Sequence, residues 1–335
     1  MEKLTKLKRL RCHNQALTSL DLSKNTELTE LHAYGNKLQT LDLSKNTKLQ
    51  LVDVHNNPGL TLTLTGNKKL IDVAEKGDKE VWTDDDGLNY LGITLFGTTG
   101  FSRLSCDPTA KLTYNSATVP ATTAKAVKIT SKTFPDAKFR AYVKRNFDKD
   151  GNGTLSLGEV VLVNSIHLTS VSGIASLKGI EYFPELRSLN AAGQKLKTVD
   201  LSKNLRLTTV TLNNNKLTSL SLTKNTKLET LYVSGNKLTT LTLTNPALVK
   251  LDCGNNIKLK TLNVTKCTKL QELDCHSCAL TALNVTKNTK LTDLDCSNNK
   301  LKSLSVTKNT KLKELDCSAN KLKTLNVTKN TKLEE

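Results

Sequence analysis

The sequence predicts an α/β repeat solenoid, mostly β, in which the chain winds into stacked narrow coils. Three copies of Leu-x-x-Leu-Asp-Cys begin at a constant interval, at Leu270, Leu291 and Leu312, and a fixed period of this size is typical of repeat architectures. Each copy holds two short apolar alternations separated by polar turns, which indicates two short strands in every coil. Only 4% of the residues are aromatic. The core is therefore expected to consist of Leu, Val, Ile and Cys.

The first array covers residues 1–70, and two further segments separate it from the remaining repeats. Its leading leucines recur at the same interval, at Leu7, Leu28, Leu49 and Leu70. Residues 71–114 show short apolar alternations broken by Gly, Asp and Pro, which predict a β-hairpin module that caps this array. Residues 115–127 are small, polar and without periodicity, and they predict a linker between two domains.

Residues 128–165 predict a helical cap that carries a metal-binding loop. Pro135 and Asp136 stand where a helix would begin. Residues 148–159 then match the twelve-residue EF-hand calcium loop, which has a glycine at position 6 and side-chain oxygens at positions 1, 3, 5 and 12. The alternative is a loop of this shape that has lost its metal. The predicted Ca²⁺ ligands are Asp148, Asp150, Asn152, the carbonyl of Thr154, Ser156 directly or through water, and both oxygens of Glu159.

The second array covers residues 166–335. From Leu186 its leading leucines again recur at the interval of the first array, at Leu207 and Leu228. The next repeat, which ends at Leu248, is one residue short, and the following repeat, which ends at Leu270, is one residue long. The two irregularities cancel, so we expect the strands on both sides to share one register.

The chain resembles bacterial leucine-rich-repeat surface proteins of the internalin family, and its cysteine-bearing repeats are similar to those of internalin J-like members. The resemblance covers residues 4–70 and 128–335, and the segment from Phe134 through the loop 148–159 to Phe183 is similar to the EF-hand-like cap of such arrays. It implies two right-handed leucine-rich-repeat arrays, export to the bacterial surface, and a role in adhesion or recognition. No particular ligand is implied.

Six of the eight cysteines are predicted to be structural rather than paired or metal-binding. Five of them occupy the inward position after a predicted strand, where they should act as small buried apolar side chains: Cys12, Cys253, Cys275, Cys296 and Cys317. Cys275 and Cys278 have the C-x-x-C spacing of redox and zinc sites. Cys278, however, stands at the turn position that Asn299 fills in the next repeat, which favours a structural role. The pattern leaves Cys106 and Cys267 undecided.

Strand alternation places a set of polar side chains on the concave face of the predicted sheets. In neighbouring repeats the aspartates of this face fall at equivalent positions, which predicts an acidic column in a protein of net charge +18. Carboxylates this close repel one another or attract cations. The predicted partner-binding residues are Tyr232, Asp252, Glu272, Asp274, His276, Asp293, Asp295, Glu314 and Asp316 in the second array, and His32, Tyr34 and His55 in the first.

The lysines fall in the turns, along the edges of the coils. Rows of surface lysines usually serve solubility and prevent edge association, and binding of an anionic polymer is the alternative. Specific nucleic-acid recognition is disfavoured because no aromatic platform or helical motif accompanies the lysines. No window holds the roughly 18 consecutive apolar residues of a membrane span. The chain starts and stops inside a repeat, so we expect it to be a fragment of a longer protein.

These features predict a non-enzymatic recognition or adhesion protein of the cell surface. Its partner, a protein or a glycan, would bind the concave faces, and Ca²⁺ would hold the cap on the second array. Free calcium is high enough outside cells to fill such a loop, which favours export. Motifs of nucleophilic, phosphate-binding or zinc-dependent enzymes do not occur in the sequence. The alternatives are a substrate-binding arm of a larger surface enzyme and a purely structural spacer.

Overall fold

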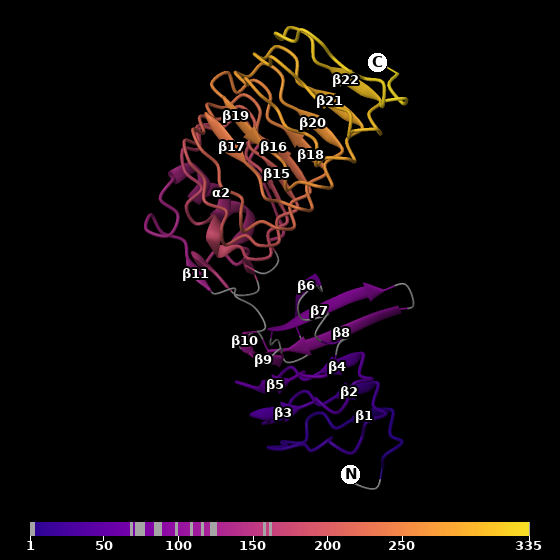
Figure 1. Ribbon diagram of the computed structural model, residues 1–335. Helices are drawn as coiled ribbons and strands as arrows, with labels where there is room; N and C mark the ends of the chain where they lie inside the picture. Colours follow the sequence, from indigo (N-terminus) through magenta and orange to yellow (C-terminus); the bar gives the residue numbers. More distant parts are fainter. Residues whose placement is uncertain are drawn as a thin grey trace. The chain divides into compact units, whose positions relative to one another are not determined.

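The computed structural model describes the chain in ranges: 4–67, 70, 78–83, 89–97, 100–107, 110–114, 117–120, 126–156, 159–160 and 163–334. The chain divides into two compact units, Met1–Lys125 and Ala126–Glu335 (Figure 1). None of the helices within these ranges has both the length and the apolar character that a membrane crossing requires.

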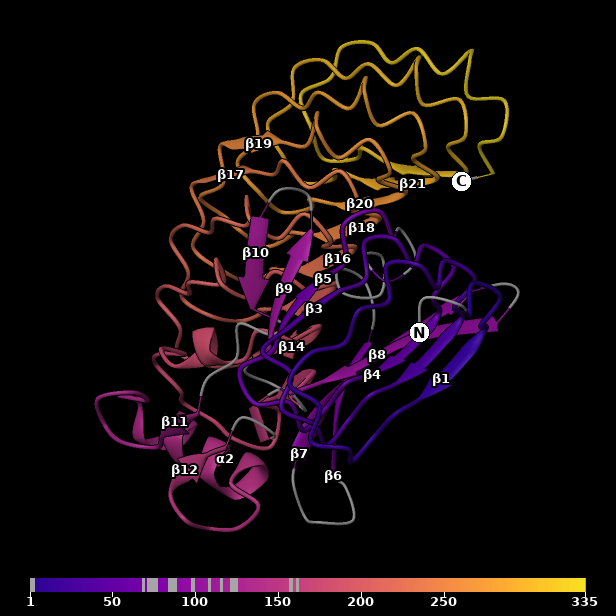
Figure 2. The ribbon, with the colours of Figure 1, turned by 90° about the horizontal axis from the view of Figure 1, so that it is seen from below.

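Two sheets form the walls of the N-terminal unit (Figure 2). In the first, parallel strands are followed by an antiparallel hairpin, in the order β1 (Arg9–Arg11), β2 (Glu30–His32), β4 (Leu51–Asp53), β8 (Gly100–Cys106), β7 (Asn89–Gly97) and β6 (Asp78–Thr83). The second contains β10 (Ala117–Pro120), β9 (Lys111–Tyr114), β5 (Thr61–Thr63) and β3 (Thr40–Asp42). Because β8 pairs in parallel with β4 and β9 with β5, the segment predicted as a capping module continues both sheets of the repeats.

The C-terminal unit begins with a helical segment packed on the first coil. Strand β11 (Val127–Lys128) pairs with β12 (Thr154–Leu155), and between them lies α2 (Ala137–Phe147). Asp136 caps α2, because its Oδ1 accepts hydrogen bonds from the backbone N–H groups of Lys138 and Phe139. The ring of Phe147 lies 5.4 Å from that of Phe183, which follows the 3-10 helix η1 (Ile180–Tyr182). Aromatic packing thus joins the helix to the repeats.

An eight-stranded parallel sheet runs along one side of the C-terminal unit (Figure 1). Its strands, in spatial order, are β13 (Ser165–His167), β14 (Ser188–Asn190), β15 (Thr209–Thr211), β16 (Thr230–Tyr232), β18 (Lys250–Asp252), β20 (Glu272–Asp274), β21 (Asp293–Asp295) and β22 (Glu314–Asp316). The central residue of each strand points into the coil, and Leu231, Leu251, Leu273 and Leu294 are at most 2% exposed. Two short strands on another side, β17 (Thr240–Thr242) and β19 (Thr261–Asn263), also pair in parallel.

Strand pairing confirms that the short and the long repeat compensate each other. Tyr232 pairs with Asp252 across the short repeat, and Asp252 pairs with Asp274 across the long one. The strands on either side of this irregularity therefore keep the same residues on the same face.

Buried asparagines hold consecutive coils together. The side-chain amide of Asn225 donates to the carbonyls of Leu201 and Asn204 in the preceding coil, at 3.0 Å each. Each of these carbonyls also accepts a backbone N–H of its own turn, so the amide adds a hydrogen bond between coils. Cys267 and Cys278 replace the asparagine in one coil each, and their Sγ atoms lie 3.7 and 3.5 Å from the carbonyls of the coil before.

Candidate functional site

The strand register confirms that the predicted aspartates are aligned. Asp252, Asp274, Asp295 and Asp316 are direct Cα partners on β18, β20, β21 and β22, and neighbouring strands lie about 4.8 Å apart. We call these four residues the acidic column. The register aligns Glu272, Asp293 and Glu314 in the same way at the start of each strand.

A short turn after each strand fixes the carboxylates of the acidic column. In every case Oδ1 accepts a hydrogen bond from the backbone N–H two residues later, at 2.8–3.0 Å. The sequence favours this geometry because an aspartate side chain readily closes such a turn on its own backbone. Each carboxylate is thus oriented by its own coil.

The two ends of the acidic column differ in their electrostatics. Burial raises the pKa of Asp252, and the negative charge of Asp274 adds to the rise. Hydrogen bonds from the side chain and backbone of Ser318 lower the pKa of the more exposed Asp316. Repulsion from Asp274 therefore contributes at the Asp252 end of the column.

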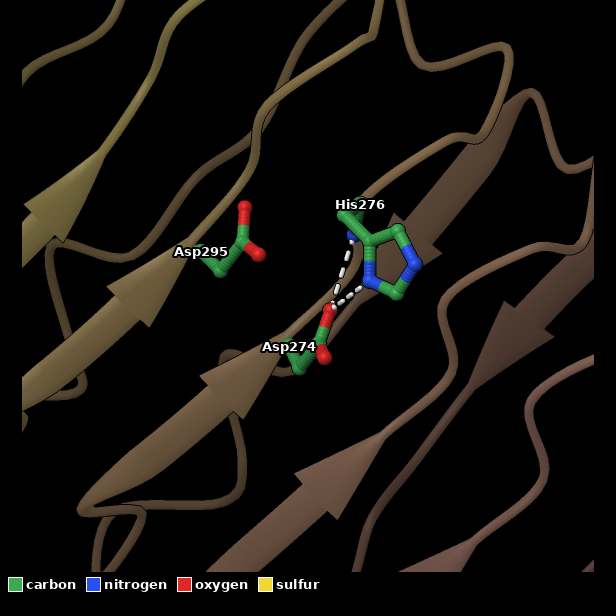
Figure 3. Close-up of side chains that lie close together, drawn as sticks. All are labelled: Asp274, His276 and Asp295. Atoms are coloured by element: carbon green, nitrogen blue, oxygen red, sulfur yellow. Dashed lines mark hydrogen bonds and ion pairs between the residues drawn. The ribbon is translucent and has the colours of Figure 1, made fainter.

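His276 lies within this crowded part of the column. Its Nδ1 is 2.6 Å from Oδ1 of Asp274, and its Nε2 is 2.8 Å from Nδ2 of Asn255. Figure 3 shows Asp295 on the neighbouring strand, on the same side of the sheet. Burial lowers the pKa of His276, but the hydrogen bond and charge of Asp274, with the charges of Asp295 and Asp252, raise it more, so that its net pKa is raised. A positive charge on the ring would offset the negative charges of Asp252, Asp274 and Asp295, which lie on three neighbouring strands.

Lys250 is a residue of this face that the sequence analysis missed. It opens β18, at the position where the following strands carry Glu272, Asp293 and Glu314. Its Nζ forms an ion pair with Glu272 and lies 5.9 Å from the ring centre of Tyr232. Alignment of the strands would have shown a single lysine among acids. Lys250 bounds the acidic face on the side of the neutral residues of β15 and β16.

On the N-terminal unit two of the predicted residues, Tyr34 and His55, lie in a ring stack. Tyr34 lies between His13 and His55, with ring centres 4.5 and 4.6 Å apart and planes inclined by 8°. The structure differs from the prediction at His55, which is only 5% exposed. The reason is that Tyr34 covers its ring and Oδ1 of Asp53 lies 2.5 Å from its Nδ1.

A small cavity of about 120 Å³ lies beside this stack. The sequence analysis identified His32 among its lining residues but missed Arg103 and Ser105, because β8 lies outside the repeating pattern. The lining residues are His32, Leu51, Val52, Asp53, Arg103 and Ser105.

The loop 148–159 brings three of the predicted Ca²⁺ ligands together. Carboxylate oxygens of Asp148, Asp150 and Glu159 lie within 4.8 Å of one another. Oδ1 of Asp148 is buried and has no hydrogen-bond donor, which is costly unless a cation or water meets it. Gly151 and Gly153 have φ values of 71° and 80°, which a tight loop requires.

The remaining predicted ligands hold this loop in shape. Oδ1 of Asn152 accepts a hydrogen bond from the N–H of Thr154, and Oε2 of Glu159 accepts from both the N–H and the hydroxyl of Ser156. Oxygen donors of this kind and number suit a hard cation such as Ca²⁺.

The cysteines are free thiols, and most are buried. Burial raises the pKa of Cys296 to about 12 and that of Cys278 to about 11. Cys12 and Cys317 are only half-buried, in contrast to the prediction, because they lie in outermost coils that have a neighbour on one side. Cys106, which the sequence left undecided, is the last residue of β8, at the position equivalent to Val54, and is fully buried.

Comparison with known proteins relates the fold to internalins. The structure of internalin C2 from Listeria monocytogenes matches with a TM-score of 0.51 and 19% identity, over 63% of this chain and 96% of that one. This likeness shows the leucine-rich-repeat fold. The functional domain of InlJ from the same organism, described as including a cysteine ladder, is 29% identical over 63% of this chain, with a TM-score of 0.39.

This chain spans 56% of the InlJ domain. A leucine-rich-repeat protein of Leptospira interrogans matches over 100% of this chain and 80% of its own, with 18% identity and a TM-score of 0.45. No family model matches the chain, and neither does any curated protein.

Proposed function

We propose that the chain is a non-enzymatic recognition module of the bacterial surface that binds a protein partner on the sheet face of its C-terminal unit. The observation that carries this proposal is the acidic column, in which four carboxylates repeat at the strand spacing. The buried leucines and the asparagine amides already account for the stacking of the coils. The column adds repulsion to the fold, so its benefit is expected to lie in binding.

The chemistry of the face favours a basic protein surface. Carboxylates spaced at about 4.8 Å present a regular negative field, and complementary charge raises the association rate and selects among partners. Their spacing follows the strands of an open sheet rather than a pocket, and an acid–base catalyst needs a cleft that holds its substrate. Recognition is therefore favoured over catalysis.

The proposal is tested by measuring binding to an array of basic proteins and glycans at two salt concentrations. The variant Asp274→Asn/Asp295→Asn/Asp316→Asn should lose binding at least tenfold. A matched control is Asp21→Asn/Asp42→Asn/Asp200→Asn, because these aspartates close the same kind of turn at 2.8–2.9 Å but lie outside the strands of the acidic column. Equal binding by both variants, or binding only to glycans, would contradict the proposal. Turnover of any bound glycan would instead favour an enzyme arm.

We also propose that the loop 148–159 binds Ca²⁺ and holds α2 on the first coil. The buried, donor-free Oδ1 of Asp148 supports this proposal. The hydroxyl of Tyr142, on α2, accepts a hydrogen bond from the backbone N–H of His167 at the end of β13. Ordering the loop that follows α2 would therefore also order this junction. The calcium concentrations that fill such loops occur outside cells, which supports a surface location.

A further inference from the structure

We propose that Asp274, His276 and Asp295 form a site for a divalent transition-metal ion of the zinc class. One oxygen of each carboxylate and one imidazole nitrogen lie within 4.8 Å of one another (Figure 3). Zinc binds nitrogen and oxygen at about 2.0–2.2 Å, so tetrahedral ligands lie about 3.4 Å apart. Small side-chain rotations would bring the three ligand atoms from separations of up to 4.8 Å to about 3.4 Å. The imidazole favours Zn²⁺ or its neighbours over Ca²⁺, which prefers oxygen ligands alone.

The three ligands come from rigid elements rather than from a loose surface. Asp274 and Asp295 are Cα partners on adjacent strands, and His276 follows Asp274 by two residues, on the same face. The N–H and hydroxyl of Ser297 donate to Oδ1 of Asp295 at 2.9 and 2.6 Å. In the described part of the chain Asp274 and Asp295 form their hydrogen bonds through Oδ1. Their Oδ2 atoms remain for an ion.

Gly254 gives independent evidence that the fold leaves space for the imidazole of His276. A Cβ atom at Gly254 would lie 2.5 Å from Nδ1 of His276 and 3.2 Å from Oδ1 of Asp274. The φ of Gly254 is not positive, so its backbone does not require glycine. The equivalent positions in other coils carry Ser234 and Ser297. The absence of a side chain at Gly254 therefore leaves space for the imidazole of His276 in the next coil.

The second ring nitrogen already has the partner that a metal-bound histidine needs. Such a histidine donates its other N–H to an oxygen, which fixes its orientation. Nε2 of His276 lies 2.8 Å from the side-chain amide of Asn255, and rotating that amide by half a turn offers its oxygen instead of its nitrogen. When Nδ1 binds the metal, it loses its proton and its bond to Oδ1 of Asp274, and Nε2–H donates to Asn255.

The test uses the metal alone, with Ca²⁺ present in excess so that the loop 148–159 is occupied. Calorimetric titration with Zn²⁺ should show one ion per chain. Titration with Co²⁺ should give visible absorption without the near-ultraviolet band of a thiolate ligand, because the neighbouring Cys275 is buried and its pKa is raised by that burial. His276→Asn and Asp295→Asn should each weaken Zn²⁺ binding about 100-fold, and Gly254→Ala should weaken it by displacing the ring.

Asp316→Asn is the matched control, because it removes a carboxylate of the same column that is not a proposed ligand, and it should change Zn²⁺ affinity less than threefold. Unchanged affinity in His276→Asn, a thiolate band with Co²⁺, or an equal loss in Asp316→Asn would overturn the site and indicate adventitious binding. Thermal unfolding of each variant identifies any that fail to fold. The metal titrations contain no protein partner. A negative result would therefore not bear on the proposed recognition function, which has a separate binding test.

Discussion

At the scale of single residues, one buried position of the repeat carries different side chains in different coils. The inward position after the strand carries Val233 in one coil and Cys253, Cys275 and Cys296 in later ones, all fully buried. A thiol of this size packs like a small apolar side chain. Its burial also suppresses the chemistry that a cysteine would otherwise have, since only the thiolate is an effective nucleophile.

We therefore predict two classes of thiol. At pH 8 an alkylating reagent should modify the half-buried Cys12 and Cys317 first, while Cys253, Cys275 and Cys296 should react at least 100-fold more slowly. The raised pKa of Cys296, about 12, leaves almost no thiolate at this pH. Peptide mapping by mass spectrometry after timed labelling measures these rates. The labelling of all eight thiols in denaturant is the control, and rapid native labelling of Cys275 would contradict the prediction.

At the scale of elements, Asp136 connects α2 to the coil that follows it. Its Oδ1 caps the helix, and its Oδ2 accepts from the backbone N–H groups of Ala175 and Ser176 at 2.8 and 3.3 Å. Burial raises the pKa of Asp136, but these backbone donors, with those of Lys138 and Phe139, lower it more, so the net pKa is lowered. One side chain thus orders two segments that are far apart in the sequence.

Asp136→Ala should lower the free energy of unfolding by about 1–2 kcal/mol, which is the usual effect of losing a helix cap. Because the folded-state pKa is lowered, this contribution is present above the unfolded pKa and is lost as the pH falls through the folded value. Urea unfolding at pH 7 and at pH 3 should therefore show a larger difference from wild type at pH 7. Asp136→Asn keeps one acceptor oxygen and should lose less. A difference that grows at pH 3 would contradict this account.

The proposed calcium loop makes a second prediction at this scale. Saturation at 100 times the dissociation constant stabilises by about 2.7 kcal/mol, which in a unit of this size corresponds to a rise in Tm of roughly 5–10 °C. Differential scanning calorimetry with Ca²⁺ and with a chelator measures the shift. Asp148→Ala should abolish it, whereas Asp200→Ala, outside the loop, should retain it. The same Tm with Ca²⁺ and with chelator would refute calcium binding.

How much the sequence could predict depended on the range of the interaction. Period and alternation sufficed for the strands and the acidic column, because each depends on the constant spacing of the repeats. The pairing of Leu51 with Arg103 was not predictable, since the inserted segment breaks the period between them. The fit of the His276 ring over Gly254 was also missed, because it depends on the space that a residue in another coil leaves empty.

At the scale of the whole molecule, charges of opposite sign occupy different places. The chain has a net charge of +18, yet one sheet face carries a row of acids. Exposed lysines recur in the turns before β16, β20, β21 and β22, and they are Lys224, Lys227, Lys266, Lys269, Lys287, Lys290, Lys308 and Lys311. Such fields act over about 10 Å at moderate salt. An anionic polymer and a basic protein would therefore meet different surfaces.

The lysine rows can be tested separately from the acidic column. Lys266→Gln/Lys287→Gln/Lys308→Gln should elute from a polyanion column at clearly lower salt than wild type, because three adjacent coils lose a cation from one row. The variant Asp274→Asn/Asp295→Asn/Asp316→Asn should elute at the same or higher salt. Reversal of this order would mean that polyanions contact the sheet face.

The asparagine amides that join each coil to the one before have a consequence for changes in the number of repeats. Asn288, Asn309 and Asn330 make the same pair of bonds, each to the preceding coils. The segment Val-Thr-Lys-Asn-Thr-Lys-Leu occurs three times in the sequence, once around each of these asparagines. Loss or gain of one whole repeat there would leave every amide matched. The number of carboxylates on the sheet face can therefore change by whole repeats while the fold stays the same.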